Sequence, residues 1–119
     1  MTQAKDAVGA YGERVAVAHL VAQGMVVLDR NWRGGFGEVD IILRDGAAVV
    51  FCEVKTRRGT RFGTPVEAIG PLKVRRLRRL AAQWMAETGV RPRWVRFDVV
   101  SVLPQSAGAA VVDHLRSAF

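Results

Sequence analysis

Acidic and basic side chains alternate along two short apolar segments that a tight turn joins. The first segment carries Glu38 and Asp40, and the second carries Glu53 and Lys55. Side chains of a β-strand alternate between its two faces, so all four are expected on one side of a sheet. Like charges opposite one another destabilise a sheet. Their accumulation indicates that something cationic belongs there, and a divalent metal ion and Lys55 are the candidates.

The turn between these segments sets the expected register. Asp45-Gly46 between two apolar runs favours a β-hairpin with a type I′ turn, which needs positive φ at both loop residues. With these two residues as the loop, Asp40 faces Phe51 and lies diagonally from Glu53. Diagonal neighbours lie about 7–8 Å apart, which lets two carboxylates hold one ion.

Carboxylate ligands favour a hard divalent cation. Mg²⁺ takes one or two protein carboxylates and fills its other positions with water and substrate phosphates. We therefore expect Mg²⁺ or Mn²⁺ at Asp40 and Glu53, with the backbone carbonyl of Val54 as a candidate further ligand. Lys55 would stand beside the ion, orient an attacking water and offset the charge of a phosphate. These are the parts that phosphodiester hydrolysis needs.

Other catalytic arrangements lack their residues. One cysteine, Cys52, and two histidines far apart in the sequence, His19 and His114, do not make a zinc set. The glycine-rich segment 34–37 lacks the phosphate-loop pattern and precedes a strand, so a bend or a close backbone approach is expected there. Cys52 has no partner for an internal disulfide, which favours a reducing cytoplasm. We expect it to be a buried small hydrophobe.

Composition narrows the class of protein. A chain of 119 residues, half of them hydrophobic, predicts one globular domain rather than a disordered chain. The sequence shows neither an apolar run long enough to span a bilayer nor a signal-peptide layout, so a cytoplasmic protein is expected. The net charge of +7 and pI near 11.0 indicate a polyanionic partner, most simply nucleic acid; charge repulsion that only keeps the protein in solution is the alternative reading.

Apolar periodicity and breaker residues predict the elements that must position these residues. Glycines at 24 and 89 mark the expected ends of two helices, and residues 64–67 have the layout of a capping box. The predicted order is a helix over 9–23, strands over 25–33, 37–44 and 47–56, a helix over 71–87, and strands over 93–102 and 110–115. It predicts a mixed sheet covered by helices.

Two charged residues fall on the apolar faces of these helices. Glu13 lies beside Ala16 and Leu20, where a carboxylate is costly unless paired; a favourable charge at the helix N-terminus is the alternative reading. Lys73 lies at the start of the second helix, from where it could reach the sheet. Together with the loop at 56–64, this helix supplies the candidate phosphate contacts, unless its arginines are only a solvated face: Arg57, Arg58, Arg61, Lys73, Arg75, Arg76 and Arg79.

These residues together resemble a known superfamily. Asp40, the run Glu53-Val54-Lys55 and the upstream Glu13 resemble the PD-(D/E)xK nucleases, although Val39 stands in place of the usual proline. A wider set of motifs is similar to the YraN-like family of small uncharacterised bacterial proteins, itself similar to archaeal Holliday-junction resolvases. Those motifs are Gly12-Glu13, Asn31-Trp32-Arg33, residues 37–40 and 51–57, Lys73, and residues 96–99.

The resemblance implies a restriction-endonuclease-like αβββαβ core in an α/β fold, with a mixed sheet flanked by helices. It implies catalytic roles for Glu13, Asp40, Glu53 and Lys55, with the three acids as ligands of Mg²⁺ or Mn²⁺; Glu38 and Lys73 receive no role. The expectation is a metal-dependent endonuclease that hydrolyses branched or otherwise structured DNA, with no membrane partner; a homodimer is compatible with the sequence. A non-catalytic nucleic-acid-binding module and a structural domain with buried ion pairs are the alternatives.

Overall fold

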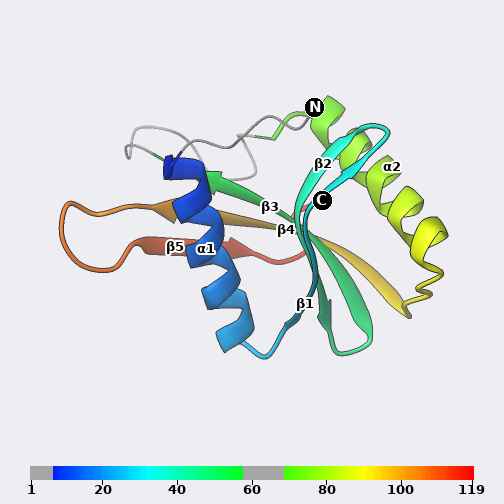
Figure 1. Ribbon diagram of the computed structural model, residues 1–119, viewed down its shortest axis with the longest axis horizontal. Coiled ribbons are helices and arrows are strands. Elements are labelled where there is room, and N and C mark those ends of the chain that lie inside the picture. Colours follow the sequence, from blue (N-terminus) through cyan, green and yellow to red (C-terminus); the bar gives the residue numbers. More distant parts are fainter. Residues whose placement is uncertain (1–6, 58–68) are drawn as a thin grey trace.

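The computed structural model describes residues 7–57 and 69–119. Two helices and five strands follow one another in these residues, in the order that the sequence predicts (Figure 1). The elements are α1 (Ala7–Ala22), β1 (Val26–Gly34), β2 (Gly37–Asp45), β3 (Ala48–Thr56), α2 (Pro71–Thr88), β4 (Trp94–Leu103) and β5 (Val111–Leu115). The expected αβββαβ order is confirmed, and so is the further strand predicted over 110–115, which is β5. The predicted capping box at 64–67 lies outside the described residues.

The strands form one mixed sheet in the order β1-β2-β3-β4-β5. All neighbours are antiparallel except β3 and β4, which are parallel. A parallel pair needs a long crossover connection, and α2 lies within that connection. The mixed α/β class expected from the sequence is therefore confirmed, and the architecture is compatible with a restriction-endonuclease-like core.

The two helices cover opposite faces of the sheet. Leu20 of α1 packs in one apolar cluster with Cys52, whereas Leu77 and Trp84 of α2 pack in the other with Phe51. Phe51 and Cys52 are consecutive in β3, so their side chains point to opposite faces. The central strand is thus apolar on both sides, and Cys52 is the fully buried small residue that the sequence predicts.

Both helices end at the predicted glycines. Gly24 has φ of 96° and Gly89 has φ of 74°, values that L-residues adopt only with strain. The N–H of Gly89 donates a hydrogen bond to the carbonyl of Met85 at 2.9 Å, which closes the last turn of α2. Of the helices in the described ranges, neither is long and apolar enough to cross a membrane.

The predicted hairpin register is wrong by two residues. Asp45 pairs with Ala48, so the loop consists of Gly46 and Ala47 instead of Asp45 and Gly46. Only Gly46 of this pair has a positive φ, 60°. A type I′ turn needs two such residues, whereas a glycine at the first loop position suits type II′.

Distant arginines explain why Asp45 belongs to the strand. Its Oδ2 accepts hydrogen bonds from Arg96 at 2.8 Å and from Arg116 at 3.2 Å. Phe51 consequently pairs with Ile42 and not with Asp40.

Because the shift is two residues, the side chains of the paired segments 41–45 and 48–52 stay on the faces that their alternation predicts. The alternation does not extend to Val39, which packs with Ile42 in the cluster below α2, whereas Ile41 packs in the cluster below α1. The expectation that all hairpin charges share one face therefore does not hold at this end of β2.

Candidate functional site

Three carboxylates from two elements converge beside the β1–β2 hairpin. Glu13 comes from α1, and Glu38 and Asp40 come from β2; one oxygen atom of each lies within 4.8 Å of the others. Glu13 is 5% exposed and Asp40 is 7% exposed. Bringing carboxylates together away from water raises their electrostatic free energy. The cluster is therefore an oxygen-rich position suited to a cation.

Asp40 lies where β2 leaves β3. The last residue pair between these strands is Ile41 with Cys52, while β2 continues along β1 to Gly37. Beyond that pair, Oδ2 of Asp40 accepts a hydrogen bond from the backbone N–H of Val54 at 2.8 Å. The carboxylate therefore replaces a backbone acceptor, and this contact fixes its position at the opening between the strands.

Gly12 and Asn31 set the position of Glu13. A Cβ atom at Gly12 would collide with the side chain of Thr56, so the glycine allows α1 to approach the end of β3. Asn31 has φ of 50°, and its Nδ2 donates a hydrogen bond to Oε1 of Glu13 at 2.8 Å. The inward orientation expected of Glu13 is confirmed. Asn31 belongs to one of the motifs on which the family resemblance rests. The sequence nevertheless does not predict that Asn31 orients Glu13.

Glu53 is paired with a lysine from the other helix. Lys73 Nζ lies 3.1 Å from Oε2 of Glu53, which confirms that Lys73 reaches from the start of α2 to the sheet. Burial and then the charge of Asp40 raise the pKa of Glu53, while Lys73 and Lys55 lower it. The sequence predicts Glu13, Asp40 and Glu53 as the ligand set, whereas the carboxylates within 4.8 Å of one another are Glu13, Asp40 and Glu38. Glu53 is still near enough for the charge of Asp40 to raise its pKa.

Lys55 lies two residues beyond Glu53 on β3, where its backbone pairs with Ser101 of β4. Its side chain is close enough for its charge to lower the pKa of Glu53. The structure therefore brings the four predicted catalytic residues to one corner of the sheet, with Glu38 and Lys73 beside them: Glu13, Asp40, Glu53 and Lys55.

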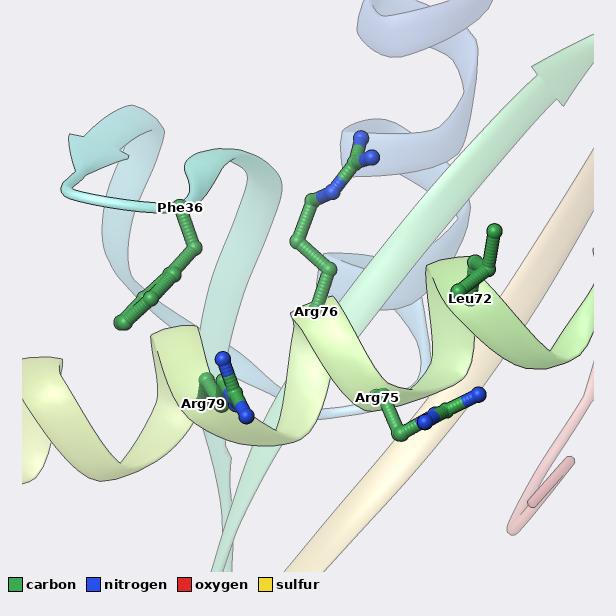
Figure 2. A pocket seen from close by; sticks show the side chains of 5 residues that line it. All are labelled: Phe36, Leu72, Arg75, Arg76 and Arg79. Carbon is green, nitrogen blue, oxygen red and sulfur yellow. The ribbon is translucent and has the colours of Figure 1, made fainter.

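Three of the predicted phosphate contacts line a groove between α2 and the β1–β2 turn. The groove has a volume of about 260 Å³, and its walls are Phe36, Leu72, Arg75, Arg76 and Arg79 (Figure 2). The guanidinium carbon of Arg79 lies 5.3 Å from the ring centre of Phe36. The sequence predicts a bend or a close backbone approach at this turn, and Phe36 is the residue that it misses.

Arg57 is placed differently from the α2 arginines. Its Nε donates a hydrogen bond to Oγ of Ser101 at 3.0 Å, and its backbone N–H donates to the carbonyl of Val102 at 2.8 Å. The side chain therefore takes part in the contact between the end of β3 and β4. Arg58 and Arg61 lie outside the described residues.

A second polar cluster surrounds Asp98, which is fully buried. Its two oxygens accept hydrogen bonds from Arg96, and Nε2 of His114 lies 2.8 Å from one of them. The rings of His114 and His19 meet edge to face at 6.1 Å, so histidines far apart in the sequence are neighbours in space. Within residues 7–57 and 69–119, the carboxylates of α1 and β2 remain the one group with metal-ligand spacing.

Comparison with known proteins shows which family the chain belongs to. The sequence model of the uncharacterised protein family UPF0102 matches residues 12–102. The chain belongs to the UPF0102 family. Its UPF0102 relatives include a protein of Beutenbergia cavernae, 58% identical over 114 residues (96% of this chain and 97% of the relative). One of Frankia alni is 57% identical over 117 residues (98% of each), and one of a Nocardioides species is 54% identical over 112 residues (94% and 90%).

The UPF0102 match contains the whole carboxylate site. It begins at Gly12, immediately before Glu13, and it extends through Lys73 to Val102. Two residues that contact Asp98 lie beyond the matched segment: His114 of β5 and Ser117 of the C-terminal segment.

Proposed function

We propose that this UPF0102 protein is a metal-dependent endonuclease of the PD-(D/E)xK type that hydrolyses DNA. The observation that carries the proposal is the convergence of Glu13, Glu38 and Asp40, whose oxygens approach within 4.8 Å. Glu53 lies near enough for the charge of Asp40 to raise its pKa, and Lys55 lowers that pKa. These residues come from α1, β2 and β3, as the resemblance to the superfamily implies.

The donor set suits Mg²⁺ or Mn²⁺. The converging atoms are carboxylate oxygens, the ligands that hard divalent cations prefer. The side chains are also preoriented, since Asn31 holds Glu13 and the N–H of Val54 holds Asp40. When bound, a divalent cation supplies positive charge that favours attack of water on a phosphate.

The surrounding residues have separate roles in this proposal. Glu13 and Asp40 hold the cation, with Glu38 at the less buried side of the cluster. Lys55 stabilises the negative charge that develops on the phosphate during hydrolysis. Lys73 is a positioning residue, because its contact with Glu53 at 3.1 Å keeps that carboxylate next to Asp40.

The charge distribution supports DNA as the substrate. The chain has a net charge of +7, and four arginines of α2 are exposed: Arg75, Arg76, Arg78 and Arg79. Arginines bind phosphate oxygens through two parallel N–H groups. Three of the four line the groove beside the β1–β2 turn, so the positive charge is concentrated on one side of α2.

A non-catalytic nucleic-acid-binding module is the second candidate. One observation favours it: Lys73 already neutralises Glu53, a residue expected to be a metal ligand. In such a module, Lys55 and Lys73 would act only as cations near the phosphates.

Cleavage of a DNA panel distinguishes these functions. The panel contains a four-way junction, a flap, a single strand and a plain duplex, each with Mg²⁺ or Mn²⁺. We expect cleavage by the wild type and none by Lys55→Ala, whose DNA affinity should stay within a few-fold because Lys55 acts on the transition state. Asp113→Asn, on the exposed face of β5, is the control and should cleave normally. A wild type that binds these DNAs and cuts none of them would favour the binding module.

A further inference from the structure

The groove on α2 combines an aromatic ring with guanidinium groups. Phe36 projects from the β1–β2 turn toward Arg79, and Arg76 rises from α2 beside that turn (Figure 2). Even with the guanidinium of Arg79 at 5.3 Å from its ring centre, Phe36 is 47% exposed. Leu72, 70% exposed, adds apolar surface one turn before Arg75 and Arg76. The groove thus offers water-exposed π surface next to three positive charges.

The turn that carries the ring is fixed on α2. The N–H of Gly35 donates a hydrogen bond to Oε1 of Gln83 at 2.8 Å, and Nε2 of Gln83 donates to Glu87 at 2.7 Å, which orients the amide. A Cβ atom at Gly34 would lie 2.5 Å from Oε1 of Gln83 and 2.6 Å from the ring of Trp32, so a larger residue would require these side chains to shift. Phe36 is therefore held over the helix by the backbone of its own turn.

The aromatic ring and the positive charges of the groove favour one class of polyanionic ligand over others. Its five lining residues include three cations and no carboxylate. Aromatic rings beside positive charge bind single-stranded nucleic acid, because an unpaired base stacks on the ring while the guanidinium groups contact phosphates. Bases inside a duplex are already stacked on their neighbours and cannot reach the ring. An acidic peptide has the charge but no base to stack.

We propose that this groove binds an unpaired nucleotide of DNA, with the base stacked on Phe36 and its phosphates held by the arginines. The groove would direct the protein to DNA that carries a single-stranded arm, such as a flap or a fork. Leu72 of the groove is the sequence neighbour of Lys73, which contacts Glu53, so groove and carboxylate site meet at the start of α2. The inference rests on the proposed function in taking DNA as the substrate.

Fluorescence anisotropy in EDTA tests the stacking without cleavage. The probes are a labelled oligothymidine, the same strand with abasic sites in place of its bases, and a duplex of equal length. Phe36→Ala should weaken oligothymidine binding about 5- to 150-fold, the range expected for one stacked base. The same variant should bind the abasic strand and the duplex as the wild type does, and Phe36→Trp should retain the affinity for oligothymidine.

Trp94→Ala is the matched control. Trp94 is another exposed aromatic residue, with the guanidinium carbon of Arg93 at 5.5 Å from its ring centre, but it lies at the start of β4 and does not line the groove. Its removal should leave all three affinities unchanged. Equal losses of oligothymidine and abasic-strand binding in Phe36→Ala would overturn the inference. Displacement of oligothymidine by polyglutamate as readily as by unlabelled oligothymidine would also overturn it.

The two proposals fail in different ways. Base-dependent binding at Phe36 in a protein that cuts no DNA would contradict the endonuclease and leave the groove assignment standing. Cleavage of plain duplex that Phe36→Ala leaves unchanged, together with unchanged oligothymidine affinity, would contradict the groove assignment and leave the endonuclease standing.

Discussion

At the scale of single residues, Glu53 is a carboxyl group whose ionisation the fold opposes. Burial and the charge of Asp40 raise its pKa, and the ammonium groups of Lys73 and Lys55 offset only part of that shift. The folded state therefore binds more protons than the unfolded chain at pH values above the ordinary pKa of glutamate. Stability from this group falls as the pH rises through that window. A cation bound beside Asp40 would lower the pKa and remove the penalty.

Glu53→Gln tests this account of the electrostatics. With metal removed by EDTA, the difference in unfolding free energy between the variant and the wild type should move in favour of the variant as the pH rises from about 4 toward neutrality. Urea unfolding at a series of pH values measures it, with Asp113→Asn as a control for the general loss of one negative charge. A wild type that gains stability over Glu53→Gln through this range would show that the sign is wrong.

Residue types and spacing predict the charged residues of the site but not the hydrogen bonds that hold them in position. Glu13, Asp40, Glu53 and Lys55 are recognisable because their chemistry and the resemblance to a nuclease superfamily agree. The hydrogen bond from Asn31 to Glu13 joins residues 18 apart and depends on the left-handed backbone of Asn31. No local pattern encodes such a contact, so the sequence alone does not reveal it.

At the scale of elements, α1 reaches the end of β3 because position 12 is a glycine. In an ordinary helix, replacing glycine by alanine stabilises the protein by about 1 kcal/mol. Here the new Cβ would collide with the side chain of Thr56, so Gly12→Ala should instead lower the unfolding free energy by about 1–3 kcal/mol. Urea denaturation measures the change. A variant more stable than the wild type would contradict the close approach of α1 and β3.

Element order is predictable from local signals, whereas the hairpin register is not. Gly24 and Gly89 end the two helices where the sequence expects them. Asp45 resembles a turn residue locally, but its strand position is held by Arg96 and Arg116, which come from β4 and the C-terminal segment. A choice between two turns that depends on such distant partners cannot be made from the turn residues alone.

At the scale of the whole molecule, three arginines of α2 gather on the side of the helix that faces the β1–β2 turn. The fold brings Phe36 to Arg79, 43 residues later in the sequence, and so makes a groove from a bend and a charged helix. The sequence could predict the arginine face from helical spacing. It could not predict the groove, because the docking of the β1–β2 turn on α2 depends on contacts such as that of Gly35 with Gln83.

Salt dependence tests this arrangement of charge. Replacing Arg75 and Arg79 with alanine should reduce the slope of log affinity for DNA against log salt by about 0.9 for each phosphate that is no longer neutralised, without changing sequence preference. Arg30 and Arg91, both exposed and outside the groove, give a double variant with the same change in net charge and should alter the slope less. Equal effects of the two double variants, or no DNA binding at low salt, would contradict phosphate binding at this face.

The most direct measurement of the central claim is calorimetric titration of Mn²⁺ into the wild type and into Asp40→Asn. Asparagine keeps an oxygen that can accept the hydrogen bond from Val54, so the opening between β2 and β3 is preserved while a charged ligand is removed. We expect one Mn²⁺ site in the wild type, absent or much weaker in Asp40→Asn and unchanged in Asp113→Asn. Equal Mn²⁺ binding by the wild type and Asp40→Asn, or no binding by the wild type, would contradict a metal centre at the Glu13, Glu38 and Asp40 cluster.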